Sequence, residues 1–383
     1  MPRLHWVGTG LSTRPGLRRL IENGHDVVVW NRTPAKALAA LEGLSADVRA
    51  FDPDAFAVAL QPGDIAVSML PGDWHVTIAQ ACLAAGAHFV SSSYISPEMQ
   101  ALNAAFRDQG LVSINEVGLD PGIDHLMAHW LVSDYRASGV HDPANEITFR
   151  SYCGGLPKIP NPFRYKFSWS PLGVLKALRS PSRSLKDFED FNVTRPWDSL
   201  TRYDAPLPAP ESFEVYPNRD SLPFIAEYDF DPDWRLRTFV RGTLRLEGWA
   251  EAWDDLFREI EGLSGPEGET RLQEMSETLL QQHQFDDGEA DRVVMCVELR
   301  ADRAGVPVYH KTYVMDAHGD DRGSAMARLV SVTVSLAVES VLEGEIAPGV
   351  SAAPPDLRLV DRWLSVVAKQ AQHLEIVDNL DQA

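Results

Sequence analysis

The sequence predicts an α/β fold made of two domains, a parallel sheet covered by helices and a second domain of different construction. Two observations predict it. Short apolar strands alternate with helices of apolar spacing over the first 114 residues, and after Glu116 the chain changes to longer strands, proline-rich loops and aromatic residues. The length of 383 residues agrees, because domains usually span roughly 100–200 residues.

The first domain is expected to begin with a strand, a glycine turn and a helix. Its strands are near-continuous apolar runs, which is typical of parallel strands that are buried on both faces. The expected strands span residues 4–8, 26–30, 64–70, 87–90 and 111–114, and the expected helices span residues 15–22, 34–42 and 74–86.

In the second part of the chain, the sequence pattern predicts longer strands and helices. Residues 292–315 alternate like two antiparallel strands, residues 324–342 form a largely apolar helix, and residues 355–377 form a final helix that packs back on the first domain. The expected domains are residues 1–120 completed by 343–383, and residues 121–342 with an insert near 249–291.

Two blocks of opposite charge mark the second domain. Residues 147–186 hold eight cations and no acid, whereas residues 249–291 hold thirteen acids and two arginines. The cationic block is expected to add positive potential for phosphates and carboxylates. The acidic block has helical spacing and is expected to be a solvated helical insert without chemistry.

The composition argues against several classes of function. The balance of 35 Lys+Arg and 55 Asp+Glu gives a net charge of −20, which disfavours nucleic-acid and anionic-membrane partners, because these are bound through clustered cations. Three distant cysteines without CxxC spacing predict no disulfide framework and no metal site. No apolar run approaches the roughly 18 residues of a membrane span, and no leader is expected before the first strand. These features favour a cytoplasmic protein.

Gly8 and Gly10 stand between the first strand and the first helix, as in a dinucleotide-binding motif. Glycines at this place let the backbone approach a pyrophosphate, and the helix N-terminus supplies partial positive charge. Thr13 occupies the third glycine position, so the motif is partial and a tight structural turn is the alternative. The strand before it, the helix after it and the second strand favour cofactor binding.

The second strand ends in Asn31, Arg32 and Thr33. An acid at this place binds the ribose 2′-hydroxyl of NAD, whereas a cation with hydrogen-bond donors suits the 2′-phosphate of NADP. NADP is therefore the expected cofactor and NAD the less favoured one. The alternative is that Arg32 is a surface arginine without a role.

Ten stretches along the chain, in order from residue 4 to about 350, resemble one family, the saccharopine reductases or glutamate-forming saccharopine dehydrogenases. They are residues 7–15 (VGTGLSTRP), 31–33 (NRT), 64–75 (DIAVSMLPGDWH), 92–97 (SSYISP), 115–125 (NEVGLDPGIDH), 151–157 (SYCGGLP), 165–175 (YKFSWSPLGVL), 213–224 (FEVYPNRDSLPF), 240–248 (VRGTLRLEG) and 323–328 (GSAMAR).

The resemblance implies a Rossmann domain, an α+β substrate-binding and dimerisation domain with a mixed sheet, a small helical insert and a homodimer. It implies oxidative cleavage of saccharopine, with NAD(P) and water, to glutamate and 2-aminoadipate 6-semialdehyde, or the reverse, in lysine metabolism. The expected cofactor contacts are Gly8, Gly10, Leu11, Ser12, Thr13, Asn31, Arg32, Thr33, Leu70, Pro71, Asp120, Pro121, Ser168, Trp169 and Ser170. The expected substrate contacts are Ser93, Tyr94, Asp120, Cys153, Arg219, Arg241, Thr243, Leu244 and Arg245.

Saccharopine carries three carboxylates around a secondary amine, and guanidinium forks bind carboxylates best. Arg241, Thr243 and Arg245 alternate along an expected strand, so their side chains share a face. Arg219 stands in a turn-like sequence, and Cys153 is expected only to line the pocket. Simple solvent exposure of the strand face is the alternative.

The amine has to lose a proton before the neighbouring C–H bond gives up its hydride, which requires a base or a proton network. Asp120 is the first candidate, Tyr94 and His125 are further catalytic candidates, and His75 and Lys166 are reserves. A helix N-cap is the alternative for Asp120, where an ionised carboxylate orients better than it accepts protons. For His125 the alternative is a packed helix residue.

Two other functions stay open. One is a related amino-acid or imine oxidoreductase, such as a carboxynorspermidine or lysine dehydrogenase, which needs fewer arginines because its substrates have fewer carboxylates. The other is a nucleotide-binding scaffold without turnover, which the joint presence of cofactor and substrate motifs disfavours.

Overall fold

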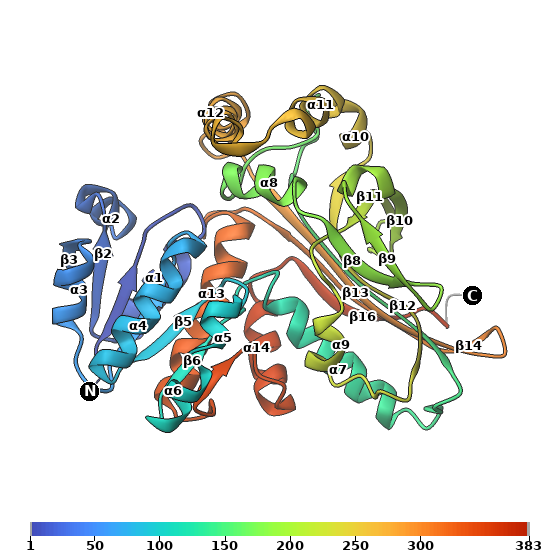
Figure 1. Ribbon diagram of the computed structural model, residues 1–383, viewed down its shortest axis with the longest axis horizontal. Helices are drawn as coiled ribbons and strands as arrows, with labels where there is room; N and C mark the ends of the chain where they lie inside the picture. The colour runs from blue at the N-terminus through green and yellow to red at the C-terminus, as the bar shows by residue number, and fades with distance from the viewer. Residues whose placement is uncertain (1, 381–383) are drawn as a thin grey trace. The chain divides into compact units, whose positions relative to one another are not determined.

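The structure is a computed structural model that describes residues 2–380, and it divides into two compact units (Figure 1). Within the described residues, the first unit comprises residues 2–126 and Ala327–Val367, and the second comprises Met127–Met326 and residues 368–380. The expected boundaries at residues 120 and 342 are therefore shifted. The first unit takes most of the apolar helix that was assigned to the second domain, and the last residues join the second unit.

The first unit contains a seven-stranded parallel sheet in the order β15-β6-β5-β4-β1-β2-β3. Its strands are β1 (Leu4–Val7), β2 (Val27–Asn31), β3 (Asp47–Ala50), β4 (Ile65–Ser68), β5 (His88–Ser91), β6 (Val112–Ile114) and β15 (Gly349–Ser351). Its helical segments are α1 (Arg14–Glu22), α2 (Pro34–Ala40), α3 (Pro53–Ala59), η1 (Gly72–Trp74), α4 (His75–Ala85), α5 (Pro97–Gln100), α6 (Asn103–Asp108), α14 (Leu357–Ala368) and most of α13 (Ala325–Leu342).

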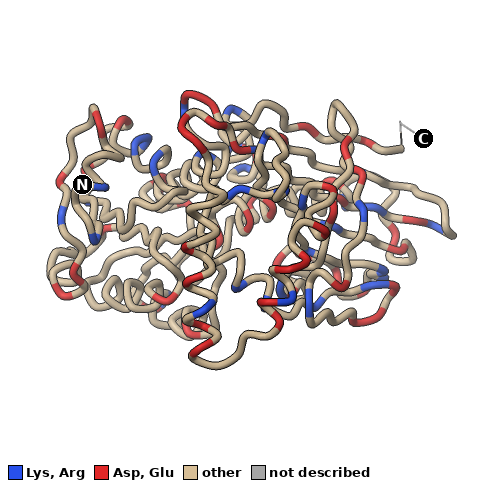
Figure 2. The backbone as a smooth tube through the Cα atoms, turned by 90° about the horizontal axis from the view of Figure 1, so that it is seen from above, with Lys and Arg blue, Asp and Glu red and all other residues tan. Residues whose placement is uncertain are grey.

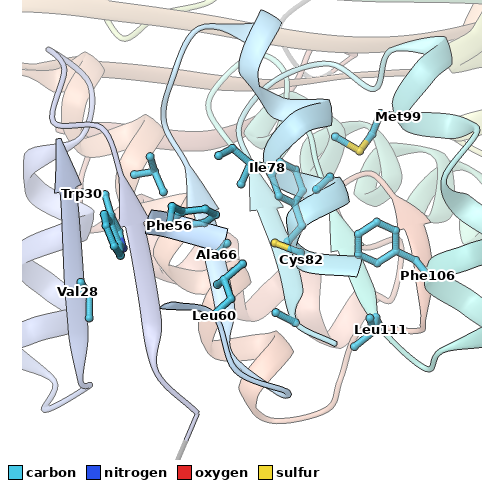
Figure 3. Packing of buried hydrophobic residues seen from close by; sticks show 14 residues of the cluster. Val28, Trp30, Phe56, Leu60, Ala66, Ile78, Cys82, Met99, Phe106 and Leu111 are labelled. Atoms are coloured by element: carbon cyan, nitrogen blue, oxygen red, sulfur yellow. The ribbon is translucent and has the colours of Figure 1, made fainter. Parts of the chain in front are cut away.

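The five strands and three helices expected in this unit are confirmed, and their apolar side chains form its core. Trp30, Phe56, Ile78 and Phe106 belong to one buried cluster (Figure 3). The sequence did not predict β3, because this edge strand has no apolar run and no fully buried residue.

The second unit is built on a mixed sheet in the order β10-β11-β12-β7-β13-β14-β16, with β8 and β9 attached to β12. Among the strand pairs of this sheet that the structure describes, only β12–β7 is parallel. The strands are β7 (Glu146–Pro157), β8 (Ser182–Lys186), β9 (Glu189–Val193), β10 (Thr201–Ala205), β11 (Glu211–Pro217), β12 (Arg235–Leu246), β13 (Asp291–Arg303), β14 (Val306–His318) and β16 (His373–Asp378). The other segments are α7 (Ile123–Ala137), which begins before residue 127, α8 (Pro171–Leu178), η2 (Pro196–Ser199), α9 (Pro223–Glu227), α10 (Trp249–Ala252), α11 (Asp254–Gly262) and α12 (Gly265–His283).

The C-terminal segment corrects one prediction. The antiparallel pair expected over residues 292–315 is confirmed as β13 and β14. The single helix expected over residues 355–377 is wrong, because α14 ends at Ala368 and β16 then pairs with β14. Alternation of His373, Leu374, Glu375 and Ile376 gives β16 its strand pattern.

The acidic insert is not merely solvated. Trp249 of α10, Phe257 of α11 and Trp253 between the two helices are buried, and α12 packs beside α8 (Figure 1). Two of its acids form ion pairs with cations of residues 147–186, Glu269 with Arg179 and Glu289 with Lys166. In Figure 2, acidic positions (red) and basic positions (blue) are scattered along the tube.

Helix α13 corrects the expectation that no apolar run approaches the length of a membrane span. It has 18 residues with a mean hydropathy of 1.6, which suffices by length and composition, and 83% of it is buried inside the protein. Burial in the core accounts for its apolar composition.

Candidate active site

The turn between β1 and α1 has the geometry of a nucleotide loop. Gly8 has φ +99°, and a Cβ there would lie 3.0 Å from the carbonyl oxygen of Met69. Thr13 is the N-cap residue of α1, and its hydroxyl donates to the Gly10 carbonyl at 2.9 Å. The Thr9 hydroxyl, which sequence reasoning missed, is buried without a hydrogen-bond partner. A loop with close backbone approach and an unused donor fits a pyrophosphate.

The rest of this loop also fits a cofactor. Leu11 is 59% exposed and Ser12 is half-buried, so neither is used in the core. Gly16, in the first turn of α1, takes the packing role of the missing third glycine, since its Cβ would lie 1.8 Å from the Ser331 carbonyl oxygen of α13. Its N–H donates to the Ser331 hydroxyl at 2.8 Å.

Arg32 follows the end of β2 on the surface of the first unit. The Asn31 amide donates to the Thr33 carbonyl at 2.8 Å and shapes the turn. The Arg32 side chain is exposed and forms no ion pair with any residue that the structure describes. This cation is therefore available for a 2′-phosphate. Leu70 and Pro71 follow β4, with Leu70 against the Gly8 position.

The His75 ring is hydrogen-bonded to the hydroxyl groups of Ser68 and Ser93. Its Nδ1 lies 2.9 Å from the Ser68 hydroxyl, and its Nε2 lies 2.7 Å from that of Ser93. Burial lowers the pKa of His75 to about 4, so the ring is neutral at pH 7. One ring nitrogen then donates and the other accepts, which fixes the Ser93 hydroxyl.

Two catalytic candidates meet in the first unit. The Tyr94 hydroxyl donates to Asp120 Oδ1 at 3.1 Å. The peptide bond between Asp120 and Pro121 is cis, and α7 begins only at Ile123. The alternative N-cap geometry, with Pro121 as first helical residue, is therefore wrong.

The third catalytic candidate, His125, has a buried acidic partner. Its side chain is fully buried, and its Nε2 lies 2.8 Å from Glu116 Oε2. The other carboxylate oxygen of Glu116 accepts the Ile95 N–H at 2.8 Å. Sequence reasoning missed Glu116, although it stands in the NEVGLDPGIDH motif.

Arg245 occupies a buried aromatic box in the second unit. Its guanidinium carbon lies 5.0, 5.6 and 5.3 Å from the ring centres of Tyr165, Tyr216 and Trp249. The residue is 5% exposed, and its Nε has no hydrogen-bond partner. Burying a cation without a carboxylate is costly, so this arrangement indicates an anionic ligand.

The acid that could have neutralised Arg245 is used elsewhere. Glu214 is its register partner on β11 and accepts the N–H groups of Gly248 and Ala250 at 2.9 and 2.8 Å. No residue that the structure describes forms an ion pair with Arg245. Nη1 of Arg245 donates to the Leu244 carbonyl oxygen at 3.2 Å, and the other N–H groups of the guanidinium are available to a ligand carboxylate.

The neighbours of Arg245 on β12 behave as a strand predicts. Arg241 is also buried, and its guanidinium carbon lies 4.0 Å from the Phe224 ring centre. Thr243 stands between the two arginines and is paired in register with Cys153. Leu244 points to the opposite face, where it joins an apolar cluster with Phe213. A side-chain contact between Leu244 and a ligand of these arginines is therefore not supported.

Arg219 differs from the other two arginines. It lies on the exposed turn after β11 with φ +57°. Ser168 is 7% exposed, and its hydroxyl has no hydrogen-bond partner, as expected of a ligand contact. Trp169 donates from Nε1 to the Tyr165 hydroxyl at 3.3 Å, whereas Ser170 caps α8.

Lys166 does not have the properties of a base. It forms an ion pair with Glu289, and this partner raises the pKa of its ammonium group. A general base near pH 7 needs a lowered lysine pKa. The raised pKa therefore argues against Lys166 as the base.

A cavity of about 760 Å³ lies on the other face of the second sheet, and it is not the arginine site. Its lining includes Arg150 and Arg300. Both are already paired, Arg150 with Glu298 at 3.1 Å and Arg300 with Asp302 at 2.8 Å.

The chain is similar to known proteins over nearly its whole length. Residues 4–114 match the family described as saccharopine dehydrogenase NADP binding domain, and residues 118–371 match the saccharopine dehydrogenase C-terminal domain. A curated saccharopine dehydrogenase (NADP+, L-glutamate-forming) of Pyricularia oryzae is 31% identical over 93% of this chain and 94% of its own length. The apo L-Glu-forming saccharopine dehydrogenase of Saccharomyces cerevisiae superposes with a TM-score of 0.79 at 26% identity, covering 98% and 99% of the two chains. A homospermidine synthase of Legionella pneumophila shares the fold with a TM-score of 0.67 at 11% identity.

Proposed function

Because the chain belongs to the saccharopine dehydrogenase family, we propose that it is an NADP-dependent oxidoreductase that cleaves saccharopine to L-glutamate and 2-aminoadipate 6-semialdehyde, or runs the reverse reaction, in lysine metabolism. The observation that supports this substrate is the environment of Arg245, whose guanidinium is buried in an aromatic box without an acid partner among the described residues. A substrate with three carboxylates supplies the missing anion.

The first unit supplies the residues for NADP. The loop from Gly8 to Thr13 would hold the pyrophosphate, and Arg32 with Thr33 would hold the 2′-phosphate. When bound, NADP is the hydride acceptor. The buried hydroxyl of Thr9 is a further donor toward it.

Tyr94 and Asp120 would manage the proton of the substrate amine. A carboxylate that accepts a hydrogen bond from a phenol forms a short proton network at 3.1 Å. In this role Asp120 orients the amine and accepts its proton. The Tyr94 hydroxyl, which donates a hydrogen bond to Asp120, takes part in this proton transfer. Ser93, held by His75, would bind the substrate beside them.

A cytoplasmic homodimer completes the proposal. The three cysteines are buried free thiols, which suits a reducing compartment. Dimerisation through the mixed-sheet domain rests on the family resemblance. Light scattering of the purified protein would give the mass, and 42.5 kDa is that of one chain.

The function is tested by incubating the purified protein with saccharopine and NADP or NAD and following the absorbance of the reduced cofactor. We expect turnover with saccharopine and a preference for NADP. Faster turnover of lysine or carboxynorspermidine would favour a related amine dehydrogenase. Binding of NADP without turnover of any of these compounds would favour a scaffold.

A further inference from the structure

Three consecutive residues of the first unit are each fixed by a different partner. The Ser93 hydroxyl is held by His75, the Tyr94 hydroxyl by Asp120, and the Ile95 N–H by Glu116. Glu116 also donates its own N–H to the Ser93 carbonyl at 3.1 Å. It therefore holds the segment from Ser93 to Ile95 on both sides of Tyr94.

Two features of Glu116 are energetically unfavourable. Its backbone has φ +55°, a left-handed conformation that is unfavourable for a residue with a side chain. Its carboxylate is also buried, with the residue 5% exposed. Such costs persist where the surrounding contacts fix the geometry, and they cluster at functional sites.

His125 holds the second oxygen of the same carboxylate. It lies in the first turn of the 15-residue helix α7, its side chain is fully buried, and its Nε2 is 2.8 Å from Glu116 Oε2. The helix thus gives the carboxylate a fixed hydrogen-bond partner. With Oε1 on the Ile95 N–H and Oε2 on His125, the orientation of the carboxylate is determined.

We infer that Glu116 and His125 are a pair of positioning residues that sets Ser93 and Tyr94 against Asp120. His125 acts through Glu116 and does not exchange a proton with the substrate. The inference rests on the proposed function, because it assigns these roles to the saccharopine reaction.

The decisive variants are His125→Gln and His125→Leu. The Nε2 of glutamine replaces that of histidine as a hydrogen-bond donor but does not titrate. We expect His125→Gln to keep kcat/KM for saccharopine within about threefold of the parent, whereas His125→Leu and Glu116→Gln lower it by about 10-fold to 100-fold, as a small misplacement of reacting groups does. The pH profile of His125→Gln is expected to keep both limbs.

A second measurement does not depend on the substrate. Hydrogen exchange of a peptide covering residues 93–96 is expected to speed up in Glu116→Ala and His125→Leu, because the Ile95 N–H loses its acceptor or that acceptor loses its support. Asp108→Asn, an exposed acid at the end of helix α6, is the matched control and is expected to change neither readout. Retained NADP affinity and a cooperative thermal transition show that each variant is folded.

The results separate the two proposals. If the parent protein does not turn over saccharopine, the proposed function fails while the exchange data still report on the positioning pair. A His125→Gln variant that is as impaired as His125→Leu and loses one limb of the pH profile would identify His125 as an acid or base and overturn the inference. Unchanged exchange at residues 93–96 in Glu116→Ala would overturn it as well.

Discussion

At the scale of single residues, burial decides between the alternatives that the sequence leaves open. Alternation along residues 241–245 predicts that Arg241, Thr243 and Arg245 share a face, but solvent exposure predicts the same pattern. The structure buries both arginines, and this burial comes from residues that are distant in sequence, such as Tyr165 and Trp249. Periodicity alone could not have revealed that box.

Arg245 gives the sharpest prediction at this scale. Arg245→Lys retains a cation among the rings but loses the two-pronged hydrogen bonding to a carboxylate. We expect KM for saccharopine to rise about 10-fold to 100-fold, which corresponds to ~1.5–3 kcal/mol for a hydrogen bond to a charged group. Steady-state kinetics measure it, and NADP affinity is expected to stay unchanged. Arg258→Ala, an exposed arginine of α11, is the control. Equal KM values for Arg245→Lys and the parent would show that the substrate carboxylates are bound elsewhere.

At the scale of elements, strong local patterns were predicted and weak ones were not. The apolar strands of the first sheet and the β13–β14 hairpin follow directly from their periodicity. The residues of β16 were assigned to a helix because they follow a long amphipathic stretch. Their strand conformation depends on pairing with β14, which lies far away in sequence, so the local pattern does not reveal it. The same applies to the glycine motif, where Gly16 rather than residue 13 makes the close helix contact.

Gly16 supplies a prediction for the packing of α1 on α13. A Cβ at this position would lie 1.8 Å from the Ser331 carbonyl oxygen, so Gly16→Ala forces the helices apart. Overpacking of this kind is expected to cost about 3 kcal/mol of unfolding free energy. Denaturant titration measures the loss. Gly10→Ala is the comparison, because its Cβ would have no atom within 4 Å, and it is expected to keep the stability. Similar stabilities for both variants would contradict the close contact.

At the scale of the whole molecule, charge is arranged in a way that composition does not reveal. The net charge of −20 and the cationic block of residues 147–186 suggested a local reversal of sign. In the structure the acidic insert supplies partners to that block, Glu269 for Arg179 and Glu289 for Lys166. Two cations of the block are thereby paired with acids of the insert, whereas Arg245, which lies outside the block, has no acid partner among the residues that the structure describes.

The buried histidines of the first unit predict how stability depends on pH. Burial lowers the pKa of His75 to about 4 and also lowers the pKa values of His5 and His88. Histidines of the unfolded chain take up protons near pH 6.5, whereas these buried histidines stay neutral in the folded protein. The free energy of unfolding is therefore highest above pH 6.5 and decreases as the pH falls toward 4. For His75 the loss is about 3 kcal/mol. Protonation of carboxylates reduces the net negative charge and so opposes this loss of stability. This effect begins only at lower pH, because free carboxylates titrate near about pH 4.

We therefore expect the melting temperature to fall steadily between about pH 6.5 and 4.5, as measured by calorimetry at constant ionic strength. His75→Gln removes the buried imidazole, so its stability should depend on pH less steeply, by up to about 1.4 kcal/mol per pH unit for one proton. The comparison of slopes, rather than of absolute stabilities, separates titration from lost packing, since the lost bonds to Ser68 and Ser93 lower the stability at every pH. A melting temperature that stays level or rises toward pH 4.5 would mean that charge repulsion, and not histidine burial, governs the acid stability of this protein.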